Sequence, residues 1–352
     1  MKTWVKLLAT SGTIGMAALG VAPAFAAGTT AGSSIVNTAT VNYTVGGVAQ
    51  TAINGSNTFT VDRRISLTVT EPGNATTSVA PGSTNQVTTF LVTNTSNATL
   101  DLGLTVAQPV GGTAAHGGTD NFDVTGTGLF VDTNLNGVYD VGTDLAVTWL
   151  DEIAADASRT VFVVRDIPAG RVNGDVAGVT LTAQARESGV TGTQGAVVAE
   201  TAGANTAGVD TVFADTAGAT DAARDGQFSA RDDYTVAAPV LTVIKLSRIV
   251  SDPLNGTTNP KMIPGATVEY CIQVANAAGG ATATAPAITD PVPSQTTYDA
   301  GYGIFLNGTV TGGVCNLDGT AGGSYAPTTV SGTLANLTGG QTRTLYFRVT
   351  IN

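Results

Sequence analysis

Charged residues are scarce in this 352-residue sequence, and basic residues are scarcer than acidic ones. Only 12% of the chain is Asp, Glu, Lys or Arg, and the formal net charge is -11. Because no basic stripe exists to neutralise phosphates, we expect the chain not to bind nucleic acid or anionic membranes. Strong helix formers are also few, whereas Val and Thr are abundant, so the composition favours strands throughout.

Side chains that carry catalysis are equally rare. The sole histidine, His116, lies in a Gly-rich segment, and the sequence contains no nucleophile elbow and no Cys/His pair. A pair of carboxylates could catalyse glycoside hydrolysis, but any acidic β-protein contains such pairs. The Gly-rich stretches lack the lysine of a phosphate-binding loop. We therefore expect the chain not to be an enzyme.

Long apolar runs are missing apart from one near the N-terminus. Lys2 and Lys6 precede a short run of small and apolar residues, and Ala24-Phe25-Ala26 has the small-x-small form of a signal-peptidase site. The run is too short and too rich in hydroxyls to span a membrane. Residues 1–26 are thus predicted to be a signal peptide, and Ala27 to begin an extracellular or cell-surface protein with no membrane insertion.

Only two cysteines occur, Cys271 and Cys315. In an exported chain without a CxxC motif, a disulfide between them is the favoured interpretation, and two separately buried thiols are the alternative. In the chain-entropy model, a disulfide that closes the loop between Cys271 and Cys315 stabilises the fold by about 4 kcal/mol.

A two-residue alternation runs through residues 34–45, SIVNTATVNYTV, and predicts one long strand. Turns are expected to follow at Gly46-Gly47 and at Asn54-Gly55. Residues 27–64 nevertheless hold too few large apolar side chains to close a core. The strand is either the first strand of its own domain or a strand donated to a neighbouring subunit. The side chains that would bind the neighbour share one face: Ile35, Ala39, Val41, Tyr43 and Val45.

An internal repeat begins at Ile65. Its first copy contains ISLTV and VAPGSTNQVTTFLVTN, and its second contains LTVIK and MIPGATVEYCIQVAN. In both copies a Pro-Gly turn leads into an alternating strand that ends in Val-x-Asn, at Asn94 and Asn276. Repetition of this unit, in a chain too long for one core, predicts tandem Ig-like β-sandwiches over residues 65–238 and 239–352. The expected fold class is all-β with an N-terminal strand or hairpin extension.

The second copy resembles the conserved repeat domain of bacterial exported surface proteins, an Ig-like domain of unassigned function. The resemblance covers residues 239–352 and extends only loosely to the first domain. It implies a β-sandwich found in large surface or adhesive proteins, usually in tandem, and it carries no activity. The residues that carry the resemblance are Lys245, Pro264, Gly265, Tyr270, Val274, Asn276, Asp290, Pro291, Pro293 and Tyr298.

The segment FVDTNLNGVYDVGTD places oxygen donors at the spacing of a calcium loop, with Gly137 at its sharp turn. Thr143 stands where such loops carry a bidentate Glu, and Asp144 follows one place later. Since two donors are uncharged amides, we expect weak Ca²⁺ affinity, about 10⁻⁴ to 10⁻³ M. The alternative is an Asn-Gly hairpin with solvated aspartates. The predicted ligands are Asp132, Asn134, Asn136, the carbonyl of Val138, Asp140 and Asp144.

A second acidic region follows within residues 186–237, which are rich in Gly and Ala and only weakly periodic. These residues are expected to form long loops with one or two edge strands. The acidic side chains match no ligand template, so we expect exposed loop charge, although a second ion site remains open. They are Asp210, Asp215, Asp221, Asp225, Asp232 and Asp233.

Three functions remain. The favoured one is a subunit of an extracellular filament or pilus-like assembly, stiffened by Ca²⁺ and polymerised head-to-tail with copies of itself by β-strand donation. No anchor motif is recognised in the C-terminal LYFRVTIN, which fits a protein held by its partners. The alternative is a monomeric adhesin or matrix protein that binds carbohydrate or another surface. A hydrolase would need a deep cleft with one raised carboxylate pKa.

Overall fold

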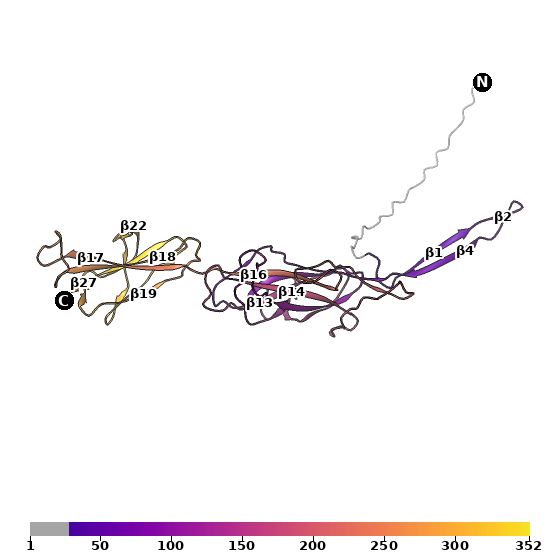
Figure 1. Ribbon diagram of the computed structural model, residues 1–352, viewed down its shortest axis with the longest axis horizontal. Helices are drawn as coiled ribbons and strands as arrows, with labels where there is room; N and C mark the ends of the chain where they lie inside the picture. The colour runs from indigo at the N-terminus through magenta and orange to yellow at the C-terminus, as the bar shows by residue number, and fades with distance from the viewer. Residues whose placement is uncertain (1–27) are drawn as a thin grey trace, which may run out of the picture.

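The computed structural model describes residues 28–352, so the predicted signal peptide and its cleavage point lie outside the described residues. The described chain consists of strands, turns and loops without a helix, which confirms the all-β prediction. It follows that no helix of residues 28–352 could cross a membrane. The molecule is elongated: a two-stranded ribbon projects from one end, a first sandwich lies in the middle, and a second sandwich forms the other end (Figure 1).

The first sandwich packs two five-stranded sheets face to face. One sheet has the order β11-β10-β13-β8-β6: Leu145–Ala146, Leu129–Val131, Ser158–Arg165, Gln86–Asn94 and Leu67–Thr70. The other has the order β12-β9-β14-β16-β7: Trp149–Ile153, Leu100–Ala107, Val176–Arg186, Gln227–Val236 and Thr77–Val79. A short parallel pair, β5 (Arg63–Ile65) and β15 (Thr211–Phe213), adjoins them.

Alternation explains how these sheets form a core. Along β8, Phe90 and Val92 are fully buried while their neighbours are partly exposed, as a strand with one face on a core requires. Apolar side chains from both sheets meet in one continuous cluster. Burial of this kind stabilises by roughly 1.5–3 kcal/mol for each large aliphatic or aromatic side chain.

The second sandwich is smaller and asymmetric. Its larger sheet has the order β17-β18-β27-β21-β24, and β20 also pairs with β27: Leu241–Ser251, Thr267–Asn276, Thr342–Ile351, Ile304–Gly308, Thr320–Ala321 and Thr296–Tyr298. The facing sheet has three strands in the order β19-β26-β25: Ala287–Pro291, Thr329–Thr333 and Ser324–Tyr325. Its core is separate from that of the first sandwich.

The repeat seen in the sequence has the same structure in both sandwiches. Gly82 and Gly265 adopt positive φ in the predicted turns, a conformation that glycine takes without strain. The buried Asn94 donates its amide to the carbonyls of Ala98 and Ile153. Asn276 occupies the matching place and donates to two carbonyls in the same way, those of Ala281 and Leu337.

The predicted disulfide is present between Cys271 and Cys315, whose Cα atoms lie 6.5 Å apart. Cys271 lies in the middle of β18, and Cys315 lies in a small hairpin of β22 (Val310–Thr311) and β23 (Val314–Cys315). The disulfide therefore ties this hairpin onto the larger sheet of the second sandwich.

Residues 186–237 differ from the expectation of loops and edge strands. β16 lies between β14 and β7 inside a sheet, because Tyr234 and Val236 continue a buried alternation that the neighbouring acidic residues hide in the sequence. The expectation of exposed acidic charge is accordingly wrong at four positions, where the side chains are buried and accept hydrogen bonds: Asp210, Asp215, Asp232 and Asp233.

Candidate functional site

The N-terminal extension is a ribbon of two antiparallel strands, β1 (Ser34–Val41) and β4 (Ile53–Thr60), with a short pair β2 (Thr44–Val45) and β3 (Val48–Ala49) at its tip. The single strand predicted over residues 34–45 is thus interrupted at Asn42-Tyr43. The predicted turn at Asn54-Gly55 is wrong, since both residues lie inside β4 and pair with β1. The turn at Gly46-Gly47 is correct, with both glycines at positive φ.

One face of the ribbon carries most of its large apolar side chains, together with Asn37 and Asn57, and this face is exposed to solvent. Opposite residues of an antiparallel pair point to the same side, so Ile35 shares a face with Phe59, and Val41 with Ile53. All four of these side chains are exposed. The predicted face residues Ala39, Tyr43 and Val45 are exposed as well. A lone two-stranded hairpin is marginally stable in water.

The second sandwich, which lies at the opposite end of the molecule from the ribbon, carries a strand that no other strand covers. β17 is the edge of the larger sheet, and its first eight residues are exposed on both faces. The three-stranded sheet opposite begins at β19, whose outer edge pairs with no strand in the described part of the chain. Between the two edges runs an apolar groove of about 390 Å³. Its apolar lining comes from Leu241, Val243, Ile272, Val274, Pro286, Ala287 and Ile288.

An ion pair bounds this groove at its outer end. Lys245 Nζ lies 2.7 Å from Asp290 Oδ1, which links β17 to β19 across the opening. The Lys245 ammonium also lies 4.5 Å from the centre of the Tyr270 ring. The groove was not foreseen from the sequence. The apolar run of β17 was visible there, but whether another strand covers it depends on the strand order of the facing sheet.

The predicted calcium loop connects β10 to β11 and folds tightly on itself. Both carboxylate oxygens of Asp132 accept backbone N–H groups, from Asn136 at 3.3 Å and Gly137 at 2.8 Å. Asp144 likewise accepts the N–H groups of Thr133 and Asp140. Gly137 has φ of 77°, as the spacing predicted. These bonds explain why two carboxylates in a surface loop are buried.

Side-chain oxygens gather at the mouth of this loop. The amides of Asn134 and Asn136 both donate to Asp140 Oδ2, at 2.9 and 2.7 Å, and these bonds lower the pKa of the Asp140 carboxyl. The three loop carboxylates do not converge on one point. Within residues 28–352, groups of three metal-type side chains with ligand atoms within 4.8 Å occur elsewhere. The loop's donors are all hard oxygens, the type that Ca²⁺ takes.

Comparisons with known proteins give only slight likenesses. No protein-family model matches the chain, and no curated protein matches it either. The resemblance of residues 239–352 to the conserved repeat domain therefore stays a prediction.

Among solved structures, the chain is similar to the C-terminal domain of the AgI/II polypeptide BspA of Streptococcus agalactiae, at 9% identity and a TM-score of 0.29, covering 82% of this chain and 91% of that one. It is also similar to the T6 backbone pilin of serotype M6 Streptococcus pyogenes, at 9% identity and a TM-score of 0.23, covering 83% of this chain and 54% of that one. The chain is also similar to a putative membrane anchored protein from Corynebacterium diphtheriae, at 12% identity and a TM-score of 0.19. This likeness covers 91% of this chain and 89% of that one. At these TM-scores the likenesses establish no shared function.

Proposed function

We propose that the protein is a subunit of an extracellular filament, in which the N-terminal ribbon of one copy fills the groove of the second sandwich in the next copy. The observation that carries this proposal is the pairing of two unsatisfied surfaces at opposite ends of one elongated molecule (Figure 1). Because the ribbon and the groove lie on different parts of the surface, their contact is heterologous, and a heterologous contact that does not close into a ring generates a filament.

The first sandwich indicates what the groove lacks. Strands of the two sandwiches can be matched by their position in the sheets and by their order along the chain. In this way β8 corresponds to β18, β9 to β19, β12 to β26 and β13 to β27. In the first sandwich, β9 pairs on its other side with β14, and β14 pairs with β16. No described strand takes these two places beside β19. The ribbon of a second copy is itself an antiparallel pair, so β1 can take the place of β14, and β4 the place of β16.

Strand direction agrees with head-to-tail growth. Ala281, before β19, bonds to Ala238 in the connection between the sandwiches, and Gln295, after β19, bonds to Asn352 at the outer end. β19 therefore runs outward, and a strand antiparallel to it runs inward. With β1 in this place, the tip of the ribbon points toward the connection, and the rest of the donor subunit lies beyond the outer end.

The chemistry of the ribbon suits burial in another subunit. Residues 28–61 contain no charged side chain, so no charge of the ribbon itself would have to be desolvated on insertion. Its apolar face would meet Leu241, Val243 and Ile288 in the groove, and its opposite face is rich in Thr and Ser that can remain in water. Backbone bonds to the free edge of β19 would add affinity, as in other cases of strand addition.

Calcium is proposed to stiffen the first sandwich. Asp132, Asn134, Asn136, Asp140, Asp144 and the carbonyl of Val138 would supply oxygen ligands. Titration of Ca²⁺ by calorimetry should give a dissociation constant of about 10⁻⁴ to 10⁻³ M. Asp140→Asn should weaken it at least tenfold without unfolding the loop, since Asp140 accepts no backbone N–H group. Unchanged affinity in this variant would rule out the loop as the site.

Electron microscopy of the exported chain in millimolar Ca²⁺ tests the assembly. We expect filaments from the wild type and none from Ala39→Arg, which puts a charge on the apolar face, or from Val243→Asp, which puts one in the groove. Thr38→Arg is the matched control, because Thr38 points to the opposite face of β1. This control should still polymerise.

Mixing the two defective variants separates donor from acceptor. Ala39→Arg keeps an intact groove and Val243→Asp keeps an intact ribbon, so an equal mixture should give dimers that grow no further, as measured by light scattering after gel filtration. Filaments from a chain that lacks residues 28–61, or a wild type that stays monomeric in all conditions, would refute the proposal. A glycan-binding screen would then address the adhesin alternative.

A further inference from the structure

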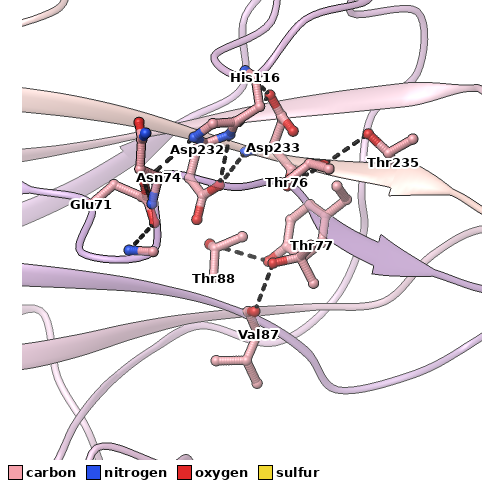
Figure 2. Close-up of polar contacts among 12 residues, drawn as sticks. Glu71, Asn74, Thr76, Thr77, Val87, Thr88, His116, Asp232, Asp233 and Thr235 are labelled. Atoms are coloured by element: carbon pink, nitrogen blue, oxygen red, sulfur yellow. Dashed lines mark hydrogen bonds and ion pairs between the residues drawn. The ribbon is translucent and has the colours of Figure 1, made fainter.

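The only histidine of the chain lies where three carboxylates meet in the first sandwich (Figure 2). His116 belongs to the connection between β9 and β10. Asp232 and Asp233 lie on β16, and Glu71 follows β6. The Nδ1 atom of His116 is 3.6 Å from Asp232 Oδ1 and 3.5 Å from Asp233 Oδ2, and its Nε2 atom is 3.4 Å from Glu71 Oε2. Side chains from three separate segments thus surround one imidazole.

Two polar atoms of this cluster are buried without a hydrogen-bond partner. They are Nδ1 of His116 and Oδ1 of Asp233, and the Asp233 side chain is completely inaccessible to solvent. Asp233 Oδ2 already accepts the backbone N–H of His116, at 2.7 Å. A buried carboxylate oxygen and a buried imidazole nitrogen without partners are costly, because each loses its contact with water.

The charges of the cluster are also unbalanced. With a neutral imidazole, the carboxylates of Glu71, Asp232 and Asp233 would place three negative charges around one ring. A cation bound to His116 Nδ1 would give this atom a partner and offset the excess of negative charge.

The distances fit a small tetrahedral ion. Zn²⁺ bonds to imidazole nitrogen and carboxylate oxygen at about 2.0–2.1 Å, so neighbouring ligand atoms in a tetrahedral site lie about 3.4 Å apart. The two distances from His116 Nδ1 to the carboxylates of Asp232 and Asp233 are close to this value. Ligand atoms of all three residues lie within 4.8 Å of one another.

Glu71 completes the arrangement from the other side of the ring. A histidine that binds metal through one nitrogen usually donates the N–H of its other nitrogen to a carboxylate, which fixes its tautomer. Glu71 Oε2 faces Nε2 in this manner and is itself held, since Gly73 and Asn74 donate their N–H groups to its carboxylate.

We propose that His116, Asp232 and Asp233 form a site for a divalent transition metal, with Zn²⁺ the expected occupant and Glu71 the residue that positions His116. The site is separate from the calcium loop. An imidazole nitrogen with few oxygens suits Zn²⁺, whereas Ca²⁺ requires six to eight oxygens. The bound ion would fasten the β9–β10 connection to β16, near the end of β16 that leads to the second sandwich.

Calorimetry with Zn²⁺ in saturating Ca²⁺, on protein purified without a histidine tag, tests this site. We expect one equivalent of Zn²⁺ for each wild-type chain, and at least 100-fold weaker binding in His116→Ala and Asp233→Asn. Glu71→Gln should weaken binding about tenfold, as is typical for a residue that orients a ligand. Asp123→Asn, which changes an exposed carboxylate on the same connection, is the matched control and should bind Zn²⁺ as the wild type does.

A second measurement needs no variant. Since His116 is the only histidine, the imidazole signals in a ¹H–¹⁵N spectrum belong to it alone, and one equivalent of Zn²⁺ should shift them and fix one tautomer. Co²⁺ in the same site should give the visible absorption of a tetrahedral complex. Imidazole signals that stay unchanged with Zn²⁺, or Zn²⁺ affinity retained in His116→Ala, would overturn the proposal. In either case the contacts of His116 with the three carboxylates would serve only the fold.

Discussion

The two sandwiches share a repeated motif but differ in what covers its first strand. Register places Leu67 and Leu241 opposite Asn94 and Asn276, and it places Val69 and Val243 opposite the matching valines of β8 and β18. Val69 is 2% exposed and Val243 is 66% exposed. Equivalent residues of one motif are therefore core in the first sandwich and open surface in the second.

The cause of this difference is the facing sheet. In the first sandwich, β14 and β16 extend that sheet beyond β9 and contact β6. In the second, the facing sheet stops at β19, so no strand of the described chain extends that sheet over β17. A strand's sequence fixes which residues alternate, but the neighbouring strands determine whether the apolar ones are buried.

The largest predicted effect comes from placing a charge at the two equivalent valines. Val69→Asp should destabilise the first sandwich by about 4 kcal/mol, because it buries an unpaired carboxylate. Val243→Asp should change the free energy of unfolding of the isolated subunit by about 0.5 kcal/mol or less. Chemical denaturation of both variants measures this difference, and equal losses would mean that β17 is covered in solution.

Removing the disulfide should affect the second sandwich alone. Cys271→Ser with Cys315→Ser opens a loop with a sequence separation of 44 residues. The chain-entropy model gives a loss of about 4 kcal/mol for a loop of this length. Calorimetry should show a lower melting temperature for the unfolding of the second sandwich and an unchanged melting temperature for the first sandwich. A shift of both transitions would show that the sandwiches unfold together.

The shared asparagines should have similar effects in the two sandwiches. Asn94→Ala and Asn276→Ala each remove the donor to two carbonyls, and unsatisfied buried groups cost about 2–3 kcal/mol in total. Each variant should lower the unfolding transition of its own sandwich. If only one of them did so, the two motifs would not be energetically equivalent.

A smaller effect concerns acid stability of the second sandwich. Hydrogen bonds from the backbone N–H and side-chain amide of Asn255, with the N–H groups of Lys261 and Leu254, lower the pKa of Asp252 to about 2. Since the carboxyl has a pKa near 3.8 when unfolded, its contribution is present above that pH and is lost as pH falls toward 2. Urea titrations at pH values from 5 to 2 measure how the free energy of unfolding falls with pH. This fall should be smaller for Asp252→Asn than for the wild type. An identical fall would contradict this role.

Much of the fold could be predicted from the sequence because it depends on local patterns. Alternation located β8 and β18, Pro-Gly marked their turns, and the two cysteines, in a chain predicted to be exported, indicated the disulfide. β16 was missed since Asp232 and Asp233 interrupt its apolar pattern, and their burial depends on contacts with distant residues.

The candidate sites were less accessible to prediction. The alternation of residues 34–45 was predicted, but neither its exposure nor its pairing with β4 was, because Asn54-Gly55 is typical of a turn and here continues a strand. The groove depends on strand order, and the cluster at His116 joins residues more than 100 positions apart. Neither leaves a short motif in the sequence.

The alignment of the strands with the long axis of the molecule has a mechanical consequence (Figure 1). If β1 of one subunit lies beside β19 of the next, tension along the filament pulls the two strands past each other lengthwise. All their hydrogen bonds then resist the load together, whereas strands set across the axis would peel apart one bond at a time. Such a filament would rupture only at high force, yet subunits could still join without any covalent link.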